Sequence, residues 1–354
     1  MTPLFKTILI VSIVSGVIVI ALTSGLVLGL KNTPSKYNDS EEEHVVLNSY
    51  DNTEELIKKY QVLNPTTVNE GIEKNIQNRL LTGFENWNRG FKTWKEWGNI
   101  LYIPTSIYNV HGARLSLASY QAAMDISLQR ATIIMGDFHN MLITDKYCGI
   151  HYDFISNGRK SKVMEFVHFE EDAEHGTYVF EGWGSTKDVS YYGLINFQAP
   201  QEKTDENTLT NDLLNHVIPT TDDLKVKYPI KFPTAYTAEE EKKLEIILEG
   251  FDSWNNGIEA YLAWVDEAYD KDAKSSGLDE VERTMDKYKE EMEQLCEEKT
   301  IKKLNFDNVL IREDWAAIHY RYRIEEENYV GDRMQFLKFQ EKDGALKIVA
   351  SWIQ

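Results

Sequence analysis

The sequence predicts an α+β protein with one N-terminal transmembrane helix and two tandem domains, in each of which helices precede an antiparallel sheet. Three observations support this fold class: a long uncharged run near the start, one motif that occurs twice, and a change of hydrophobic period within each copy. A length of 354 residues suits two domains of ordinary size. The apolar fraction of 42% is enough to build a core in each.

Residues 8–30 contain no charged side chain. At about 1.5 Å per residue, a helix of this length covers the roughly 30 Å hydrocarbon core of a bilayer. A cleaved signal peptide is the alternative, although Ser24-Gly25-Leu26 fits a small-x-small cleavage site poorly. We therefore expect a single-pass protein of the cell membrane, with residues 1–7 as a short tail and residues 31–354 outside the cytoplasm.

Charge and cysteine content limit the possible partners. The formal net charge is −19 and no basic stripe occurs, so we expect no nucleic-acid partner. Cys148 and Cys296 are too few for a disulfide framework, and a single bridge between them stays open. His139, His151, His168 and His175 lack a metal-ligand spacing such as His-Glu-x-x-His, so we expect neither a metal nor another cofactor.

An internal duplication is the strongest feature of the chain. The segment Phe84–Gly90 (FENWNRG) returns 167 residues later as Phe251–Gly257 (FDSWNNG). The match continues with a slowly growing offset, as small loop insertions would produce. The further pairs are Trp97 with Trp264, Ile150-His151-Tyr152 with Ile318-His319-Tyr320, and Trp183 with Trp352.

Each copy is expected to open with a helix. Thr66 or Thr67 and Thr237 are plausible N-caps. Apolar side chains then recur at 84, 87, 91 and 94, and at 251, 254, 258 and 261, which predicts one buried stripe per helix. Gly90 and Gly257 interrupt these stripes and indicate close packing or a bend. A second helix is predicted at 116–129 in the first copy and at 278–296 in the second.

The period then changes to two, which predicts strands. Aromatic and β-branched residues alternate at 141–154, 162–169 and 177–183, and again at 309–324, 333–339 and 345–352. Helices followed by strands give the α+β order. The predicted domains are 66–198 and 237–354. A polar stalk (31–65, with a possible helix at 54–60) precedes the first domain, and a linker (199–236, with a possible helix near 209–216) joins the two domains.

These motifs resemble those of the nuclear transport factor 2-like superfamily, and most of all its SnoaL-like polyketide cyclase branch. The resemblance is carried by Phe-x-x-Trp-Asn-x-Gly, by the loop Tyr102–Gly112 (Tyr-x5-Tyr-x-x-His-Gly), and by Glu181-Gly182-Trp183. It implies a cone in which a curved antiparallel sheet wraps over helices and leaves a pocket at its open end. Because this fold hosts both enzymes and binding modules, it does not settle the function.

The resemblance also implies candidate site residues. The cyclases carry an acid in a Trp-x-x-x-Asp pattern, and here Asp188 follows Trp183 at one residue more. Asp188 and His111, which would lie at the pocket mouth, are the candidate catalytic residues for proton transfer. An exposed turn position for Asp188 and a packed loop position for His111 are the alternatives. The candidate ligand-binding residues are Trp87, Trp94, Tyr102, Tyr108, Tyr120 and Trp183.

We expect a membrane-anchored binding or interaction protein with a pocket for a small apolar or aromatic ligand in the first domain, which alone has the loop histidine and tyrosines. The alternative is a cofactor-independent cyclase or isomerase that moves a proton beside a carbonyl. A third possibility is that the two copies, or two chains, pack sheet against sheet and leave no open pocket. Strand alternation separately places His151 and His319 on a solvated or inter-domain face, opposite their neighbours Ile150/Tyr152 and Ile318/Tyr320, and we prefer this to a catalytic role.

Overall fold

The computed structural model describes residues 50–110, 113–130, 133–156, 158–186, 220–277, 281–327 and 329–354. The predicted membrane segment 8–30, the segment 209–216 and the candidate catalytic residues His111 and Asp188 lie outside these ranges. Among the described helices, none combines the length and the apolar character needed to cross a membrane.

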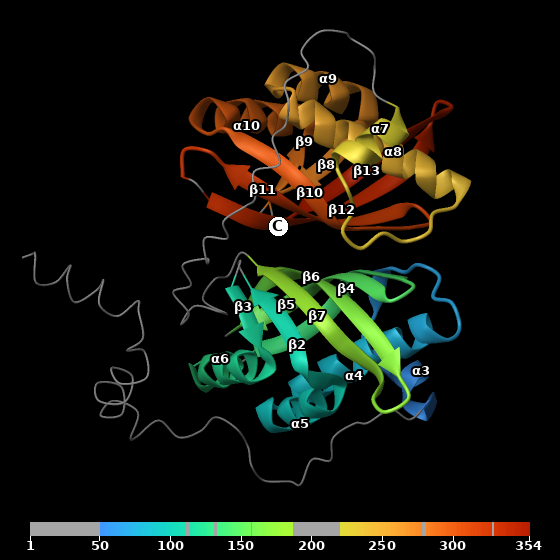
Figure 1. Ribbon diagram of the computed structural model, residues 1–354, viewed down its shortest axis with the longest axis vertical. Helices are drawn as coiled ribbons and strands as arrows, with labels where there is room; N and C mark the ends of the chain where they lie inside the picture. Colours follow the sequence, from blue (N-terminus) through green and yellow to red (C-terminus); the bar gives the residue numbers. More distant parts are fainter. Residues whose placement is uncertain are drawn as a thin grey trace, which may run out of the picture. The chain divides into compact units, whose positions relative to one another are not determined.

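Where it is described, the first half contains a seven-stranded sheet and four helices (Figure 1). The sheet has the order β1-β4-β5-β6-β7-β2-β3, in which β1 is parallel to β4 and β2 is parallel to β7. The helices are α3 (Tyr50–Lys59), α4 (Ile72–Arg89), α5 (Phe91–Leu101) and α6 (Leu117–Arg130). The strands are β1 (Val62–Asn64), β2 (Tyr102–Val110), β3 (Ala113–Ser116), β4 (Ile133–Thr144), β5 (Tyr147–Ser156), β6 (Arg159–Asp172) and β7 (Gly176–Thr186).

The second half repeats this arrangement with a six-stranded sheet of order β10-β11-β12-β13-β8-β9. In place of β1 it has a single parallel bridge between Ile230 and Phe306, which corresponds to the pair Val62 and Phe138 in the first half. Its helices are α7 (Thr221–Lys227), α8 (Ala238–Asn255), α9 (Ile258–Ala268) and α10 (Met285–Glu298). Its strands are β8 (Tyr269–Ser276), β9 (Glu282–Thr284), β10 (Ile301–Arg312), β11 (Trp315–Ile324), β12 (Tyr329–Lys342) and β13 (Ala345–Ile353).

The predicted α+β class with two sheets is confirmed, and several local predictions need correction. Thr237 is the N-cap of α8, as predicted, and it also forms a capping box with Glu240. The N-cap at Thr66 or Thr67 is wrong, because α4 begins after Gly71. The bend predicted at the two glycines is present: Gly90 (φ 137°) and Gly257 (φ 114°) each separate two helices. Such positive φ values suit glycine, which has no Cβ to clash.

Element boundaries also differ from the sequence prediction. The second helix of the second half begins at Met285 instead of 278, because residues 282–284 pair with β8 as strand β9. The stretches 141–154 and 309–324 are each interrupted by a tight turn, with Asp145 (φ 54°) and Glu313 (φ 53°) in the left-handed region. Strands β2, β3, β8 and β9 were not predicted, because they are short or lack regular alternation.

The Trp-Asn pair of the repeated motif attaches each long helix to a strand. In the first half, the Asn88 amide donates to the carbonyl oxygen of Met135 (2.9 Å) and accepts from its N–H (2.8 Å). Trp87 Nε1 donates to the carbonyl of Ile133 (3.1 Å). In the second half, Asn255 makes the same two bonds to Lys303, and Trp254 donates to Ile301. The motif therefore has a structural role in both halves.

A second repeated contact joins the first helix of each half to the long helix that follows. Lys59 and Tyr60 both bond to the Glu85 carboxylate, at 2.5 and 2.8 Å. Lys227 and Tyr228 make the equivalent bonds to Asp252, at 2.6 and 2.8 Å. Helices α3 and α7, which lie in the predicted stalk and linker, are thus packed against α4 and α8. The helix predicted at 54–60 corresponds to α3.

Side chains on the sheet faces that point away from the helices form a mixed core with members from both halves. The cluster comprises Leu142, Met164, Phe166, Trp183, Leu310, Trp315, Ala317, Met334 and Phe336. The ring of His151 stacks on Phe336 (centroids 5.8 Å apart), and His319 contacts Phe166 (5.4 Å). Arg312 of the second half also donates to the Glu73 carboxylate of the first half (2.6 Å). Within the described residues, the two histidines therefore face the other half.

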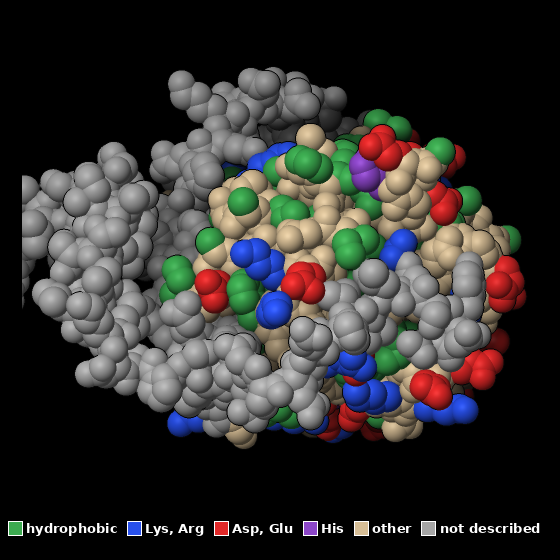
Figure 2. All heavy atoms as spheres, turned by 90° about the horizontal axis from the view of Figure 1, so that it is seen from below, with side chains coloured by type: hydrophobic (Ala, Val, Ile, Leu, Met, Phe, Trp, Pro, Cys, Tyr) green, Lys and Arg blue, Asp and Glu red, His purple; other side chains and the backbone are tan. Residues whose placement is uncertain are grey.

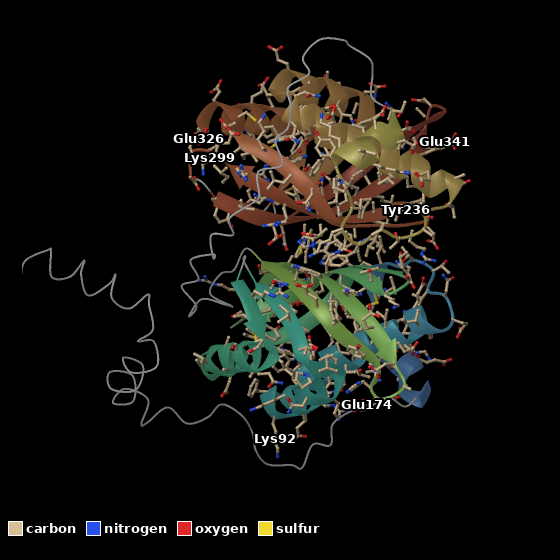
Figure 3. All side chains as sticks on the ribbon, viewed as in Figure 1. Lys92, Glu174, Tyr236, Lys299, Glu326 and Glu341 are labelled. Carbon is tan, nitrogen blue, oxygen red and sulfur yellow. The ribbon has the colours of Figure 1, made fainter. Side chains whose placement is uncertain are left out.

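The outer surface on the α5 side mixes both signs of charge with apolar groups. Figure 2 shows Lys and Arg, Asp and Glu, and hydrophobic side chains interspersed over this face. Lys92 on α5 is exposed and extends away from the ribbon in Figure 3. Where described, this face presents no large area of one sign that would attract a polyanion.

We predict that Asn88→Ala destabilises the protein by about 2 kcal/mol or more, because both backbone groups of Met135 lose their side-chain partner. Urea unfolding followed by tryptophan fluorescence measures this change. Lys92→Ala is the matched control on an exposed helix position and should stay within about 0.5 kcal/mol of the wild type. An Asn88→Ala protein as stable as this control would contradict the structural role of the motif.

Candidate functional site

A cavity lies in the first half between helices α4, α5 and α6 and the strands of the sheet. It contains about 580 Å³ of space free of protein atoms, part of which is open to solvent. Its lining is mostly aromatic and aliphatic, and the charged residues in it are Arg79 and Glu165. Burial lowers the pKa of Arg79, although a guanidinium still keeps its charge near neutral pH.

Five of the six predicted ligand-binding residues line this cavity: Trp87, Trp94, Tyr102, Tyr108 and Tyr120. The sixth, Trp183, does not. Its partner across the β6–β7 ladder is Phe166, and both side chains belong to the mixed core on the other face of the sheet. His111 and Asp188 lie outside the described residues, and their catalytic role stays a prediction.

The aromatic walls are held by ring-to-ring contacts. Tyr108 stacks on Tyr120 with centroids 4.2 Å apart and an interplanar angle of 21°. Trp94 meets Tyr120 edge to face at 5.7 Å, and Trp87 meets Trp94 in the same way at 4.9 Å. Gly182 makes room for the Tyr108 ring, since a Cβ there would lie 2.7 Å from it. Interlocked rings of this kind form a rigid apolar surface.

Glu165 places a carboxyl group in this apolar surrounding. The Tyr152 hydroxyl donates to Glu165 Oε1 at 2.6 Å, and Tyr108 is a second hydrogen-bonding neighbour. Burial raises the pKa of Glu165 above its usual value, and the two tyrosine hydroxyls partly oppose this shift. Part of its surface is open to the cavity, while protein atoms enclose the rest.

Glu165 was missed at the sequence level, although a signal was present. It lies between Val163 and Val167 in the period-two pattern of β6, on the face that a strand normally fills with apolar side chains. A carboxylate is rarely buried unless it is paired or functional. The register confirms the position, because Glu165 is directly opposite Ile150, another residue of the cavity wall.

The equivalent space in the second half is occupied by a lysine. Lys303 corresponds to the cavity residue Met135, since the motif asparagine binds the backbone of each. Its Nζ lies 5.0–5.5 Å from four ring centroids. These rings belong to Phe251, Trp254, Tyr261 and Tyr320, which are the counterparts of Phe84, Trp87, Trp94 and Tyr152.

Two consequences follow from this comparison. Burial lowers the pKa of Lys303 to about 7, while attraction between an ammonium and the surrounding ring faces opposes the loss of its proton. Glu165 also has no acidic counterpart in the second half. Gln335 occupies the equivalent position, because it is opposite Ile318 just as Glu165 is opposite Ile150. The acidic, aromatic cavity therefore belongs to the first half.

No protein-family model matches the chain, and no curated protein matches it. Several solved structures show similarity at low identity. A protein from Jannaschia provisionally named a SnoaL-like polyketide cyclase is 13% identical to this chain, with a TM-score of 0.29. The match covers 34% of this chain and 90% of that one. An NTF2-like protein of unknown function from Pseudomonas putida is 14% identical with a TM-score of 0.28, covering 34% and 87%.

A third structure is provisionally named an isomerase of the SnoaL-like family, from Agrobacterium tumefaciens. It is 10% identical with a TM-score of 0.26, and the match covers 31% of this chain and 96% of that one. The names of these similar structures are thus NTF2-like and SnoaL-like. At such identities and TM-scores they carry no conclusion about the activity of this chain.

We predict that Glu165→Gln makes the protein more stable at pH 8 and that the gain shrinks toward pH 5. Because the folded-state pKa of Glu165 is raised, the folded protein binds more protons than the unfolded chain above pH about 4.5, so its stability falls as pH rises through this range. Glutamine keeps the shape and the acceptor for Tyr152 but cannot ionise.

Thermal unfolding at several pH values measures this effect. The control is Glu341→Gln, at an exposed position labelled in Figure 3, which should leave the pH profile unchanged. A Glu165→Gln protein that is less stable than the wild type by the same amount at every pH would show that the buried carboxylate is not a cost to the fold.

Proposed function

We propose that this protein is a membrane-anchored binding protein of the SnoaL-like type, whose first half takes up a small, largely apolar ligand with one hydrogen-bonding oxygen. One observation carries the proposal: the Glu165 carboxyl group faces a cavity whose other walls are mainly aromatic rings. Apolar walls with a few well-placed polar groups are typical of sites for small molecules.

The ring geometry favours a flat ligand. The stacked pair of Tyr108 and Tyr120, with Trp94 edge-on to it, offers both ring faces and ring edges. Offset stacking and edge-to-face contacts with such rings add roughly 0.5–1.5 kcal/mol each beyond burial of apolar area. Polycyclic and aromatic ketones combine a flat apolar body with one carbonyl oxygen, which a protonated Glu165 can bind as a donor.

To test this proposal, the full chain is titrated with a panel of aromatic and polycyclic ketones while tryptophan fluorescence and thermal stability are followed. We expect saturable quenching and a raised melting temperature for at least one of them. Met135→Lys, which copies the second half, should abolish both effects, because the lysine fills the space between the same rings.

The matched control is Lys303→Met in the second half, which should leave ligand binding intact. Both variants retain the hydrophobic N-terminal segment. A loss of binding in Met135→Lys alone would therefore distinguish binding in the cavity from unspecific partitioning into that segment. Equal binding by Met135→Lys and by the wild type would refute the choice of cavity.

A second candidate function is favoured by the pair of Glu165 and Tyr152. A carboxyl group with a raised pKa, held by a tyrosine hydroxyl at 2.6 Å, suits proton transfer at a carbon beside a carbonyl. This would make the protein a cofactor-independent isomerase or cyclase. Any ketone that binds should then exchange the hydrogen on the carbon beside its carbonyl group for deuterium in heavy water. Exchange that persists in Glu165→Gln but stops in His111→Ala or Asp188→Asn would assign the chemistry to the residues predicted from sequence.

The membrane anchor is the remaining part of the proposal. It rests on the uncharged run 8–30, with residues 31–354 placed outside the cytoplasm. We expect the intact protein to stay with membranes after alkaline carbonate extraction, and added protease to degrade residues 31–354 in intact cells. A deletion of residues 8–30 should release the protein into the soluble fraction. Mature protein that lacks these residues would indicate a cleaved signal peptide instead.

A further inference from the structure

Three potential metal ligands meet on three neighbouring strands of the second half: Asp307 on β10, His319 on β11 and Asp332 on β12. His319 Nε2 lies 3.4 Å from Asp332 Oδ1 and 4.0 Å from Asp307 Oδ2, and the three ligand atoms lie within 4.8 Å of one another. A register shift between Phe306 and Asn308 makes Asp307 the extra residue of a β-bulge. Such bulges redirect a side chain relative to regular alternation.

The central histidine is buried and unsatisfied. The His319 side chain is 0% exposed, and neither ring nitrogen has a hydrogen-bond partner among the described residues. The rings of Phe166 and Trp183 pack against it at centroid distances of 5.4 and 5.3 Å. Leaving a buried polar group without a partner costs free energy, and such groups call for an explanation. Nε2 is directed at the two carboxylates without the alignment of a hydrogen bond.

We propose that Asp307, His319 and Asp332 bind a divalent transition-metal ion, with Zn²⁺ as the best fit. Zn²⁺ binds imidazole nitrogen and carboxylate oxygen at about 2.0–2.2 Å, so tetrahedral ligand atoms lie roughly 3.3–3.6 Å apart. The observed 3.4 and 4.0 Å require only small side-chain movements. Three protein ligands leave a fourth position for water. Asp332, with 29% of its side chain exposed, provides the route from solvent.

The first half provides an internal comparison. The residues equivalent to Asp307, His319 and Asp332 are His139, His151 and Lys162, by the ladder registers of the two sheets. His151 is also buried without a hydrogen-bond partner among the described residues. A lysine in place of Asp332 supplies a positive charge, however, and His139 is already bound to Asp153 at 2.8 Å. The proposed site is therefore restricted to the second half.

The competing explanation is a metal-free ion cluster. Lys231 and Arg321 lie close enough to Asp307 to act on it electrostatically, so they balance part of the carboxylate charge. The two explanations differ in the bond that they assign to His319. A metal ion would bind Nε2 directly, whereas in the ion cluster Lys231 and Arg321 act on the carboxylate charge and leave Nε2 without a ligand.

The test uses the full chain, stripped of metal with a chelator and then titrated with Zn²⁺ and separately with Co²⁺. We expect one ion to bind per chain, the melting temperature to rise, and Co²⁺ to give the visible absorption of low-coordinate nitrogen and oxygen ligation. Asp332→Asn removes one charged ligand at the more exposed position and should weaken binding by at least about tenfold. Asp343→Asn, at an exposed turn after β12, is the control and should bind normally.

Circular dichroism of metal-free Asp332→Asn checks that the variant is folded, and Asp307→Asn serves as the second variant if it is not. Absence of saturable binding to the wild type would overturn the proposal in favour of the ion cluster. So would binding that Asp332→Asn or Asp307→Asn leaves unchanged, because the ion would then occupy another place on the chain.

Discussion

The pair of hydrogen bonds between Asn88 and the backbone of Met135 determines how the first half is built. It attaches the long helix α4 at a point where β4 departs from regular pairing, between Met135 and Phe138. A bulged segment has backbone groups that the ladder does not use, and the asparagine amide satisfies both of them. The distance between helix and sheet, and hence the space for a cavity, depends on this contact.

Because the contact is made to the backbone, the side chain of the strand residue can differ without loss of the attachment. The first half has Met135 at this position and an open cavity, whereas the second half has Lys303 among the equivalent rings. The same scaffold therefore supports two different interiors. Substitutions on the sheet faces that point away from the helices are more restricted, because both of these faces contribute side chains to the mixed core. Trp183, Phe166 and His319 pack together there, and a change in one half alters contacts of the other.

The sequence predicted those features that depend on local spacing. The duplication, the order of helices and strands, and the cavity position of Trp87 and Trp94 follow from motif offsets and from helical periodicity. It did not predict which sheet face Trp183 occupies. A register shift between His168 and Phe169 changes the facing of β6 relative to β7, and alternation read from one strand cannot detect this. The sequence also did not predict Glu165 as a site residue. Its aromatic neighbours come from other strands and helices, and only the fold brings them together.

The two interiors share one electrostatic property, which bears on the kind of ligand. Burial raises the pKa of the Glu165 carboxyl and lowers the pKa of the Lys303 ammonium to about 7, so each surrounding disfavours the charged form of the group that it contains. Both environments are built from equivalent rings. Any charged group on a ligand that enters the first cavity would carry the same free-energy cost of burial. If the cavity binds a ligand as proposed, the ring walls would favour a neutral molecule, and the carboxyl of Glu165 would fix the position of its oxygen.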